Sequence, residues 1–122
     1  MPDEAVKTKR ARQKIIQLYT DQGYQVTEEE VFPCFNNMGE AIFPPYQADI
    51  LVTKKIIIEL DPTRLHGTAR HRSKDHWRDE NIFREYSIPT ARLNPDDIIK
   101  QVSIDILLEI DSQVLEQNNN KK

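Results

Sequence analysis

Three acidic residues stand within or beside two short apolar segments of this sequence. Asp49 lies within the segment 47–53, and Glu59 and Asp61 stand at the end of the segment 56–60. Carboxylates are unfavourable in apolar surroundings unless they are paired, hydrogen bonded or bound to a metal ion. Mg²⁺ and Mn²⁺ prefer carboxylate oxygens, and such ions polarise a phosphodiester and activate an attacking water. These residue types therefore indicate metal-dependent phosphodiesterase chemistry.

The spacing of the two segments decides whether the carboxylates meet. Lys54–Lys55 is a tight turn between them, so we expect two antiparallel strands. Pairing about this turn brings Asp49 to the level of residue 60, at the same end of the hairpin as Glu59. Glu59 and Asp61 share a face if the strand continues. From these acids alone, the alternative is that Asp49 opens a turn and Glu59 lies on an exposed strand end.

Hydrophobic periodicity and turn residues predict the elements that must position these acids. Helices are expected over 4–22, 74–86 and from Pro95 to about 116. Strands are expected over 24–32, 47–53, 56–60 and 88–93, with a loop or irregular hairpin over 33–46. The segment 56–60 is apolar on both faces and should be central, whereas Pro89 predicts an irregular or edge strand. This order predicts an α/β fold with a mixed sheet of about four strands flanked by helices.

Composition predicts one globular domain over residues 1–116 and a disordered tail over 117–122. The 122 residues are 38% hydrophobic and 30% charged. No apolar run is long enough to span a membrane, and the acidic start lacks the apolar stretch of a secretory signal. Cys34 is the single cysteine and cannot form an internal disulfide. A reducing, cytoplasmic location is therefore expected.

Basic residues are segregated even though the net charge is −3. Phosphate binding depends on local positive potential rather than on net charge. Residues 7–14 contain five basic residues and no acid, and residues 64–78 contain five basic residues against Asp75. The candidates for contacting a nucleic-acid backbone are Lys7, Arg10, Lys14, Arg64, Arg70, Arg72, Lys74 and Arg78. The alternative is two solvated basic faces.

The predicted last helix carries apolar residues on two sides. One side is lined by Ile99, Val102, Ile106, Ile110 and Val114, and the other by Ile104, Leu108 and Leu115. This is more apolar surface than one core contact needs. The second side is therefore a candidate homodimer interface.

The acids fit a longer pattern. Asp49 is followed ten residues later by Glu59-Leu60-Asp61, which resembles the PD-(D/E)xK nuclease motif. The likeness is to the very-short-patch-repair-like branch, in which Glu-hydrophobic-Asp ends a strand, a histidine follows, Asp-x-x-Arg opens a helix and a later strand ends in arginine. The corresponding residues here are Glu59-Leu60-Asp61, His66, Asp75 with Arg78, and Arg92. This sequence departs in having Pro62 where glycine is usual. As in that branch, Asp61 stands where most of the superfamily has lysine.

The resemblance implies a restriction-endonuclease-like fold and roles for particular residues. Asp49, Glu59 and the backbone carbonyl of Leu60 would hold Mg²⁺ or Mn²⁺. Asp61 would be a further ligand or would orient water, and His66 would be the general acid or base. The supporting residues would be Glu4, Asp75 and Arg92. His66 as a loop residue without a role, and Asp75 with Arg78 as a plain intrahelical ion pair, stay open alternatives.

The predicted function is a metal-dependent endonuclease that hydrolyses DNA phosphodiester bonds. One alternative is a catalytically inactive nuclease-like subunit that binds DNA or protein, which the missing lysine favours. Another is a different α/β domain that mediates protein contacts through its apolar last helix. The sequence leaves DNA against RNA, and any sequence or structure specificity, open.

Overall fold

The computed structural model describes residues 2–62 and 74–120. The chain forms four helices and six strands within these ranges. In order they are α1 (Pro2–Thr20), β1 (Val26–Glu28), β2 (Val31–Phe35), β3 (Ala41–Gln47), β4 (Ile50–Val52), β5 (Ile56–Leu60), α2 (Lys74–Tyr86), β6 (Thr90–Leu93), α3 (Pro95–Lys100) and α4 (Ser103–Asn120). In the described part of the chain, no helix is both long enough and apolar enough to cross a membrane.

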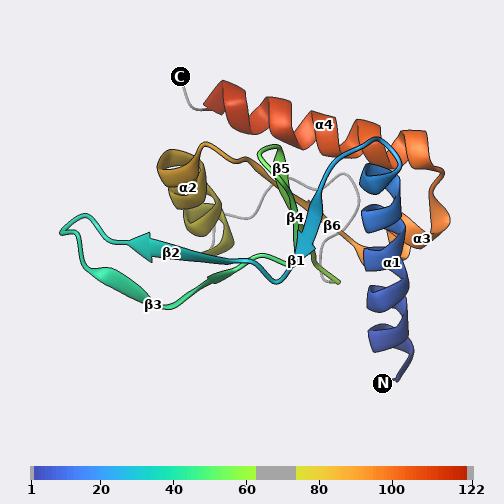
Figure 1. The fold of residues 1–122 in the computed structure, drawn as a ribbon, viewed down its shortest axis with the longest axis horizontal. Coiled ribbons are helices and arrows are strands. Elements are labelled where there is room, and N and C mark those ends of the chain that lie inside the picture. The colour runs from blue at the N-terminus through green and yellow to red at the C-terminus, as the bar shows by residue number, and fades with distance from the viewer. Residues whose placement is uncertain (1, 63–73, 121–122) are drawn as a thin grey trace.

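Four strands form one mixed sheet in the order β1-β4-β5-β6. β1 pairs antiparallel with β4, β4 pairs antiparallel with β5, and β5 pairs parallel with β6. The parallel pair requires a crossover connection, and α2 lies within it (Figure 1). The predicted α/β class with a mixed four-stranded sheet is confirmed. β5 is central and β6 lies at an edge, as the run 56–60 and Pro89 predict.

The sheet separates two hydrophobic cores, because alternate side chains of β5 point to opposite faces. Ile58 belongs to the core beneath α1, α3 and α4, whereas Ile57 belongs to the core beneath α2 and the β2–β3 hairpin. The first core also includes Ala11, Ile15, Tyr19, Ile98, Ile106 and Ile110. The second also includes Phe32, Cys34, Tyr46, Ala48 and Ile82. Figure 1 shows the corresponding helices on either side of the sheet.

The structure of residues 24–47, before β4, differs from the prediction. The expected strand over 24–32 divides into β1 and β2, because Glu29 adopts a positive φ of 57° between them. β2 then pairs with β3 in a separate two-stranded sheet, where a loop or irregular hairpin was expected. The register shifts between Phe32 and Cys34, around Pro33, which has no N–H to donate. The hairpin projects from the body of the protein (Figure 1).

The predicted last helix is in fact two helices. α3 begins at the Asn94 cap, whose side chain accepts a hydrogen bond from the Asp96 N–H. Gln101 then adopts an extended conformation, with φ −85° and ψ 152°, and ends α3. Pattern analysis missed this break because Ile99 and Val102 continue the apolar periodicity through it.

The predicted disordered tail over 117–122 is wrong for residues 117–120. α4 continues to Asn120, and Gln117 is buried with only 6% of its surface exposed. Its side-chain oxygen accepts a hydrogen bond from the Thr90 N–H at 2.9 Å. Residues 121–122 lie outside the described residues. The folded domain therefore extends past residue 116.

Candidate functional site

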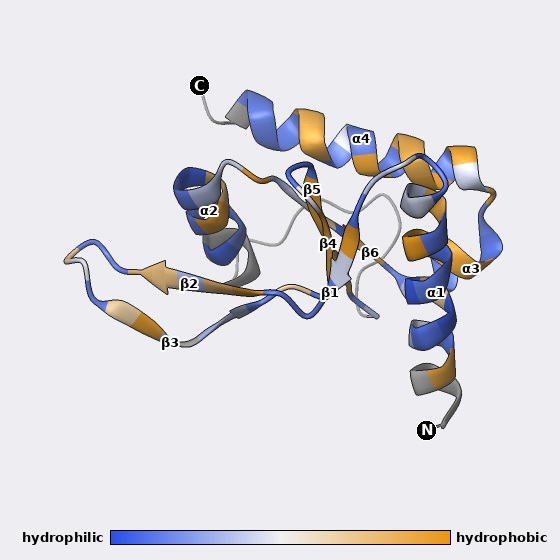
Figure 2. Cartoon of the chain, in the orientation of Figure 1, coloured by the Kyte–Doolittle hydropathy of each residue, from blue (hydrophilic) through white to orange (hydrophobic). Residues whose placement is uncertain are grey.

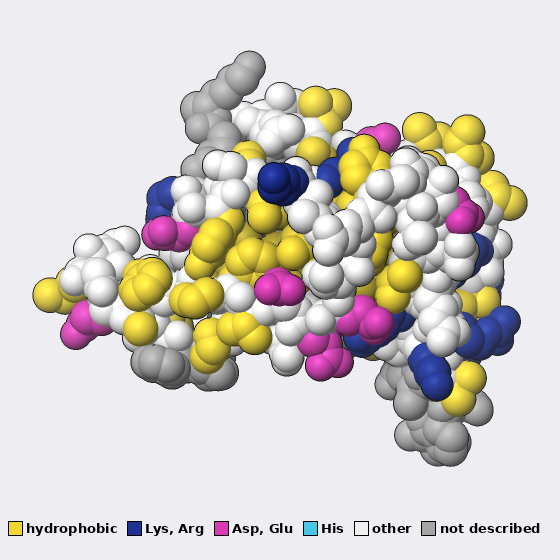
Figure 3. Space-filling model, viewed as in Figure 1, with side chains coloured by type: hydrophobic (Ala, Val, Ile, Leu, Met, Phe, Trp, Pro, Cys, Tyr) yellow, Lys and Arg dark blue, Asp and Glu magenta, His cyan; other side chains and the backbone are white. Residues whose placement is uncertain are grey.

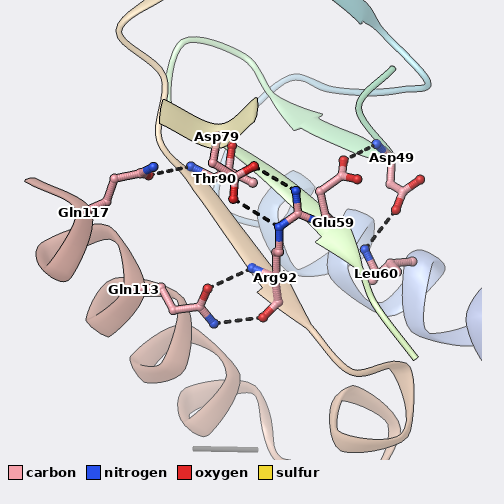
Figure 4. A network of polar contacts seen from close by, with 8 residues as sticks. All are labelled: Asp49, Glu59, Leu60, Asp79, Thr90, Arg92, Gln113 and Gln117. Atoms are coloured by element: carbon pink, nitrogen blue, oxygen red, sulfur yellow. Dashed lines mark hydrogen bonds and ion pairs between the residues drawn. The ribbon is translucent and has the colours of Figure 1, made fainter. Parts of the chain in front are cut away.

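Asp49 and Glu59 lie side by side at one end of the β4–β5 hairpin. The register pairs Ile50 with Ile58, so the residue before β4 stands opposite the penultimate residue of β5. The Asp49 N–H donates a hydrogen bond to Glu59 Oε2 at 2.8 Å, and the Leu60 N–H donates one to Asp49 Oδ2 at 2.9 Å (Figure 4). The convergence that the spacing predicts is therefore present. The role of these residues as metal ligands stays a prediction.

Glu59 sits in an environment that opposes its negative charge. Burial and the neighbouring charge of Asp49 raise the pKa of the Glu59 carboxyl from 4.5 to about 7. The Asp49 N–H, the Tyr46 hydroxyl and the Arg92 guanidinium act in the opposite direction but do not cancel this effect. The carboxylate pair therefore carries negative charge that its surroundings compensate only in part, which is a condition that favours a bound cation.

Tyr46 adds a contact that sequence analysis missed. Its ring is buried in β3, three residues before Asp49, and its hydroxyl lies beside Glu59 although the geometry falls short of a regular hydrogen bond. The guanidinium of Arg78 lies over the Tyr46 ring, 5.0 Å from its centroid. Arg78 was a candidate phosphate contact, and the structure places it on the same side of the sheet as Glu59.

Arg92 is held beside the carboxylates by a buried ion pair. It is the register partner of Glu59 in the parallel β5–β6 pair. Its Nε and Nη2 atoms donate to Asp79 Oδ2 at 3.1 Å and Asp79 Oδ1 at 2.8 Å, and Asp79 is completely buried. Figure 4 shows the guanidinium between Asp79 and Glu59. Sequence analysis identified Arg92 but missed Asp79, which lies one helical turn after Asp75 in α2.

Two glutamines of α4 cap the edge of the sheet and fix Arg92. Gln113 accepts a hydrogen bond from the Arg92 N–H at 2.8 Å and donates one to the Arg92 carbonyl at 2.9 Å. The Gln117 side-chain oxygen accepts a hydrogen bond from the N–H of Thr90, two residues before Arg92 in β6 (Figure 4). These side-chain amides satisfy backbone groups that an edge strand would otherwise leave unpaired. α4 thus helps to position the positive charge of Arg92 beside Glu59.

Leu60 is the last residue of β5, and Asp61 follows it directly. The Asp61 N–H donates to the Leu93 carbonyl at 2.8 Å, and Asp61 is half-buried. Among the described residues, no group of three or more His, Cys, Asp or Glu side chains is arranged to hold a metal ion. The described site is therefore a two-carboxylate centre. The participation of Asp61 and of the Leu60 carbonyl stays a prediction.

The basic residues at the start of the chain do not share a face with Glu59. α1 packs against the opposite side of the sheet from α2. Lys7 forms an exposed ion pair with Asp96 at 3.2 Å, and Arg10 is exposed. Figure 3 shows Lys and Arg side chains over α1. Lys7 and Arg10 therefore lie on another side of the sheet from Glu59, and their contact with nucleic acid stays a prediction.

The side chain of Lys14 is held by hydrogen bonds within the protein. Its ammonium donates to the carbonyls of Ile98 at 2.7 Å and Gln101 at 2.6 Å. These carbonyls lie at the C-terminal end of α3, where a positive charge is favourable. Lys14 therefore joins α1 to α3, and we omit it from the proposed nucleic-acid surface.

Several predicted site residues lie outside the described residues. These are Arg64, His66, Arg70 and Arg72. Glu4 lies in α1 and Lys74 and Asp75 lie in α2, but their side chains are also outside the described part. Their predicted roles stay predictions. Comparisons of the chain with protein-family models, with curated proteins and with solved structures found no match.

Proposed function

We propose that this protein is a Mg²⁺- or Mn²⁺-dependent endonuclease that hydrolyses DNA phosphodiester bonds. The observation that carries the proposal is the convergence of Asp49 and Glu59 at adjoining strand ends, with Glu59 partly buried. A buried carboxylate beside a second carboxylate is unfavourable unless another charge compensates it. A bound cation would supply this compensating charge.

The oxygen atoms at the site fit a hard divalent cation. Backbone N–H groups fix Asp49 Oδ2 and Glu59 Oε2. The Tyr46 hydroxyl also lies beside Glu59. Each carboxylate is therefore oriented by a backbone hydrogen bond to one oxygen, and we propose that its other oxygen coordinates the cation. The Leu60 carbonyl is the third proposed ligand.

The residues around the carboxylates suit phosphodiester hydrolysis. When bound, the cation would polarise the phosphodiester and lower the pKa of an attacking water. Arg92, held by Asp79, places a positive charge beside Glu59 and limits repulsion between the site and a phosphate. His66 is the proposed general acid or base, because its ordinary pKa lies near neutrality. Asp61 is proposed as a further ligand or as a residue that orients water.

The order of elements supports a restriction-endonuclease-like fold. A first helix, a β4–β5 hairpin that carries the acids, a crossover helix α2 and a parallel strand β6 follow the order that the PD-(D/E)xK resemblance implies. We propose DNA as the substrate, with Arg78 on the side of the sheet that carries Glu59 and Lys7 and Arg10 on a second surface. We also propose a cytoplasmic location, because the single cysteine, Cys34, is a buried free thiol.

A cleavage assay tests this proposal. Purified protein is incubated with supercoiled plasmid and with branched, mismatched and single-stranded DNA, with EDTA, Mg²⁺ or Mn²⁺. Cleavage should require a metal ion and should fall by at least about 10²-fold in Asp49→Asn and in Glu59→Gln, because each removes a charged ligand. Glu85→Gln makes the same chemical change at an exposed position of α2 and should leave the rate unchanged. Cleavage at the parental rate in both site variants would refute the proposal.

One alternative has a specific observation in its favour. Asp61 stands where most PD-(D/E)xK nucleases have lysine, and within the described residues no third His, Cys, Asp or Glu side chain is grouped with Asp49 and Glu59 to hold a metal ion. These features favour a nuclease-like subunit that binds DNA without cleaving it. If the protein binds DNA and Mn²⁺ but cleaves none of these substrates, the inactive subunit is the correct description.

A further inference from the structure

Helix α4 exposes a stripe of large apolar side chains on the side away from the sheet. Ile106 and Ile110 are each 1% exposed and pack in the core, whereas Ile104 is 65%, Leu108 60% and Leu115 62% exposed. Figure 2 shows hydrophobic residues recurring along α4 except at its C-terminal end, and Figure 3 shows hydrophobic side chains at the surface of this helix. Single exposed apolar residues are common, but a stripe along one helix face marks a contact surface. We call Ile104, Leu108, Asp111 and Leu115 the outer stripe.

A carboxylate lies inside this stripe. At 3.6 residues per turn, Ile104, Leu108, Asp111 and Leu115 fall within about 60° of one another around the helix axis. Asp111 is exposed, and within the described part of the chain its carboxylate forms no hydrogen bond or ion pair. Its charge nevertheless contributes, after burial, to raising the pKa of Tyr19 in α1 to about 12. The stripe therefore presents an apolar surface with an uncompensated negative charge between Leu108 and Leu115.

The rest of helix α4 is also negatively charged. Residues 101–120 contain no lysine or arginine. The acids on the helix are Asp105, Glu109, Asp111 and Glu116. This charge opposes binding of a nucleic-acid backbone or an anionic lipid surface, both of which require positive potential. A protein surface with the opposite charge is the occupant that the stripe fits.

The charge also argues against pairing of two copies through α4. An antiparallel two-fold pair centred on the stripe would bring the two Asp111 carboxylates together while removing them from water. Like charges in a desolvated contact are strongly unfavourable. A cation from a different partner at the same position would instead form a charge-assisted contact. The homodimer that the apolar pattern suggested is thus disfavoured by the residue at its centre.

We propose that the outer stripe of α4 is a docking surface for an amphipathic helix of another protein. The partner helix lays its apolar side on Ile104, Leu108 and Leu115 and places a lysine or arginine against Asp111. Helix-in-groove and helix-on-helix recognition use anchors at this spacing. The docking surface lies on the opposite side of α4 from Gln113 and Gln117, which hold the site strand β6. The inference is independent of the proposed nuclease activity.

A charge-swap experiment tests the docking surface. The probe is a synthetic 21-residue amphipathic helix of leucine, alanine and glutamine with one central lysine on its apolar side, and the matched probe has glutamate there. Binding of both fluorescent peptides to the full chain is measured by anisotropy. Wild type should bind the lysine peptide about 10- to 100-fold more tightly, as expected for one charge-assisted contact. Asp111→Lys should reverse the preference, and Leu108→Gln should weaken binding of both peptides.

The control is Glu85→Lys, which makes an equal change of net charge at an exposed position on α2 and should keep the wild-type preference. Failure of both peptides to bind, equal binding of the two, or an unchanged preference in Asp111→Lys would overturn the proposal. Sedimentation of wild type and Leu108→Gln distinguishes the other occupant. A wild-type dimer that Leu108→Gln dissociates would show that a second copy covers the stripe.

Discussion

Replacing Glu59 with glutamine should stabilise the protein at alkaline pH in the absence of metal. Folding raises the pKa of the Glu59 carboxyl from 4.5 to about 7, first through burial and then through the charge of Asp49. Between these two values the folded protein holds a proton that the unfolded chain has released. The free energy of unfolding therefore falls as pH rises from about 4.5 to about 7 and stays lower above that. A glutamine at position 59 is uncharged at every pH, so the variant's stability does not fall in this way as pH rises.

The size of the effect follows from the same values. One pKa unit corresponds to roughly 1.4 kcal/mol, so the charged form of Glu59 costs about 3 kcal/mol in the folded state. Glutamine has nearly the same shape, and its side-chain oxygen can still accept the hydrogen bond from the Asp49 N–H. Glu59→Gln should therefore gain up to about 3 kcal/mol over wild type at pH 8. At pH 4.5, where folded wild type is protonated, the gain should be less than about 1 kcal/mol.

Urea denaturation followed by far-UV circular dichroism measures this difference at pH 4.5, 6, 7 and 8 in the presence of EDTA. Glu85→Gln is the exposed control and should match wild type at every pH. Adding Mg²⁺ at pH 8 should stabilise wild type but not Glu59→Gln, because ligands stabilise only a state that binds them. A gain in Glu59→Gln that is equal at pH 4.5 and pH 8, or a loss at pH 8, would refute the account of this site.

Three further predictions concern other contacts. Arg92→Ala removes the partner of the buried Asp79 carboxylate and should lower the free energy of unfolding by about 3–5 kcal/mol, measured in urea; a loss below about 1 kcal/mol would contradict it. Gln113→Ala breaks two hydrogen bonds to β6 and should cost about 1–3 kcal/mol and speed amide exchange in that strand; unchanged exchange would count against it. His66→Ala should slow single-turnover cleavage about 10²- to 10⁴-fold with little change in Mn²⁺ affinity; full activity would show that another group does this work.

The hairpin that carries the acids was predictable because local rules determine it. Lys54 adopts a positive φ of 62° in the turn, and the apolar run after it makes a strand buried on both faces. Turn chemistry and a period of two residues then determine the register, and the register places Asp49 opposite Glu59. The central position of β5 followed from the same run.

The residues that surround the acids could not be predicted in this way. Tyr46 and Asp79 reach Glu59 and Arg92 from elements that the sequence separates by loops. Their positions depend on how the hairpin and α2 pack on the sheet, which no local period records. Gln117 was assigned to a disordered tail on composition alone, yet its hydrogen bond to β6 orders the end of α4. Polar residues buried by tertiary contacts are invisible to hydropathy patterns.

The breaks in regular structure were also missed for identifiable reasons. Glu29 separates β1 from β2 through a positive φ, which non-glycine residues adopt infrequently and which the run of three glutamates does not signal. Gln101 separates α3 from α4 by an extended conformation, although neither glycine nor proline marks the position. In both cases the apolar residues on either side continue a plausible period. Backbone geometry at one residue then decides where the element ends.

Calorimetric titration with Mn²⁺ at pH 7 tests the central claim most directly, because it measures cation binding at the two carboxylates without assuming a substrate. Wild type should bind Mn²⁺ and release protons on binding, since Glu59 has a pKa of about 7 in the metal-free protein. Asp49→Asn and Glu59→Gln should each abolish this binding, and Glu85→Gln should preserve it. Binding of Mn²⁺ with unchanged affinity in both Asp49→Asn and Glu59→Gln would contradict the claim that these residues form a metal centre.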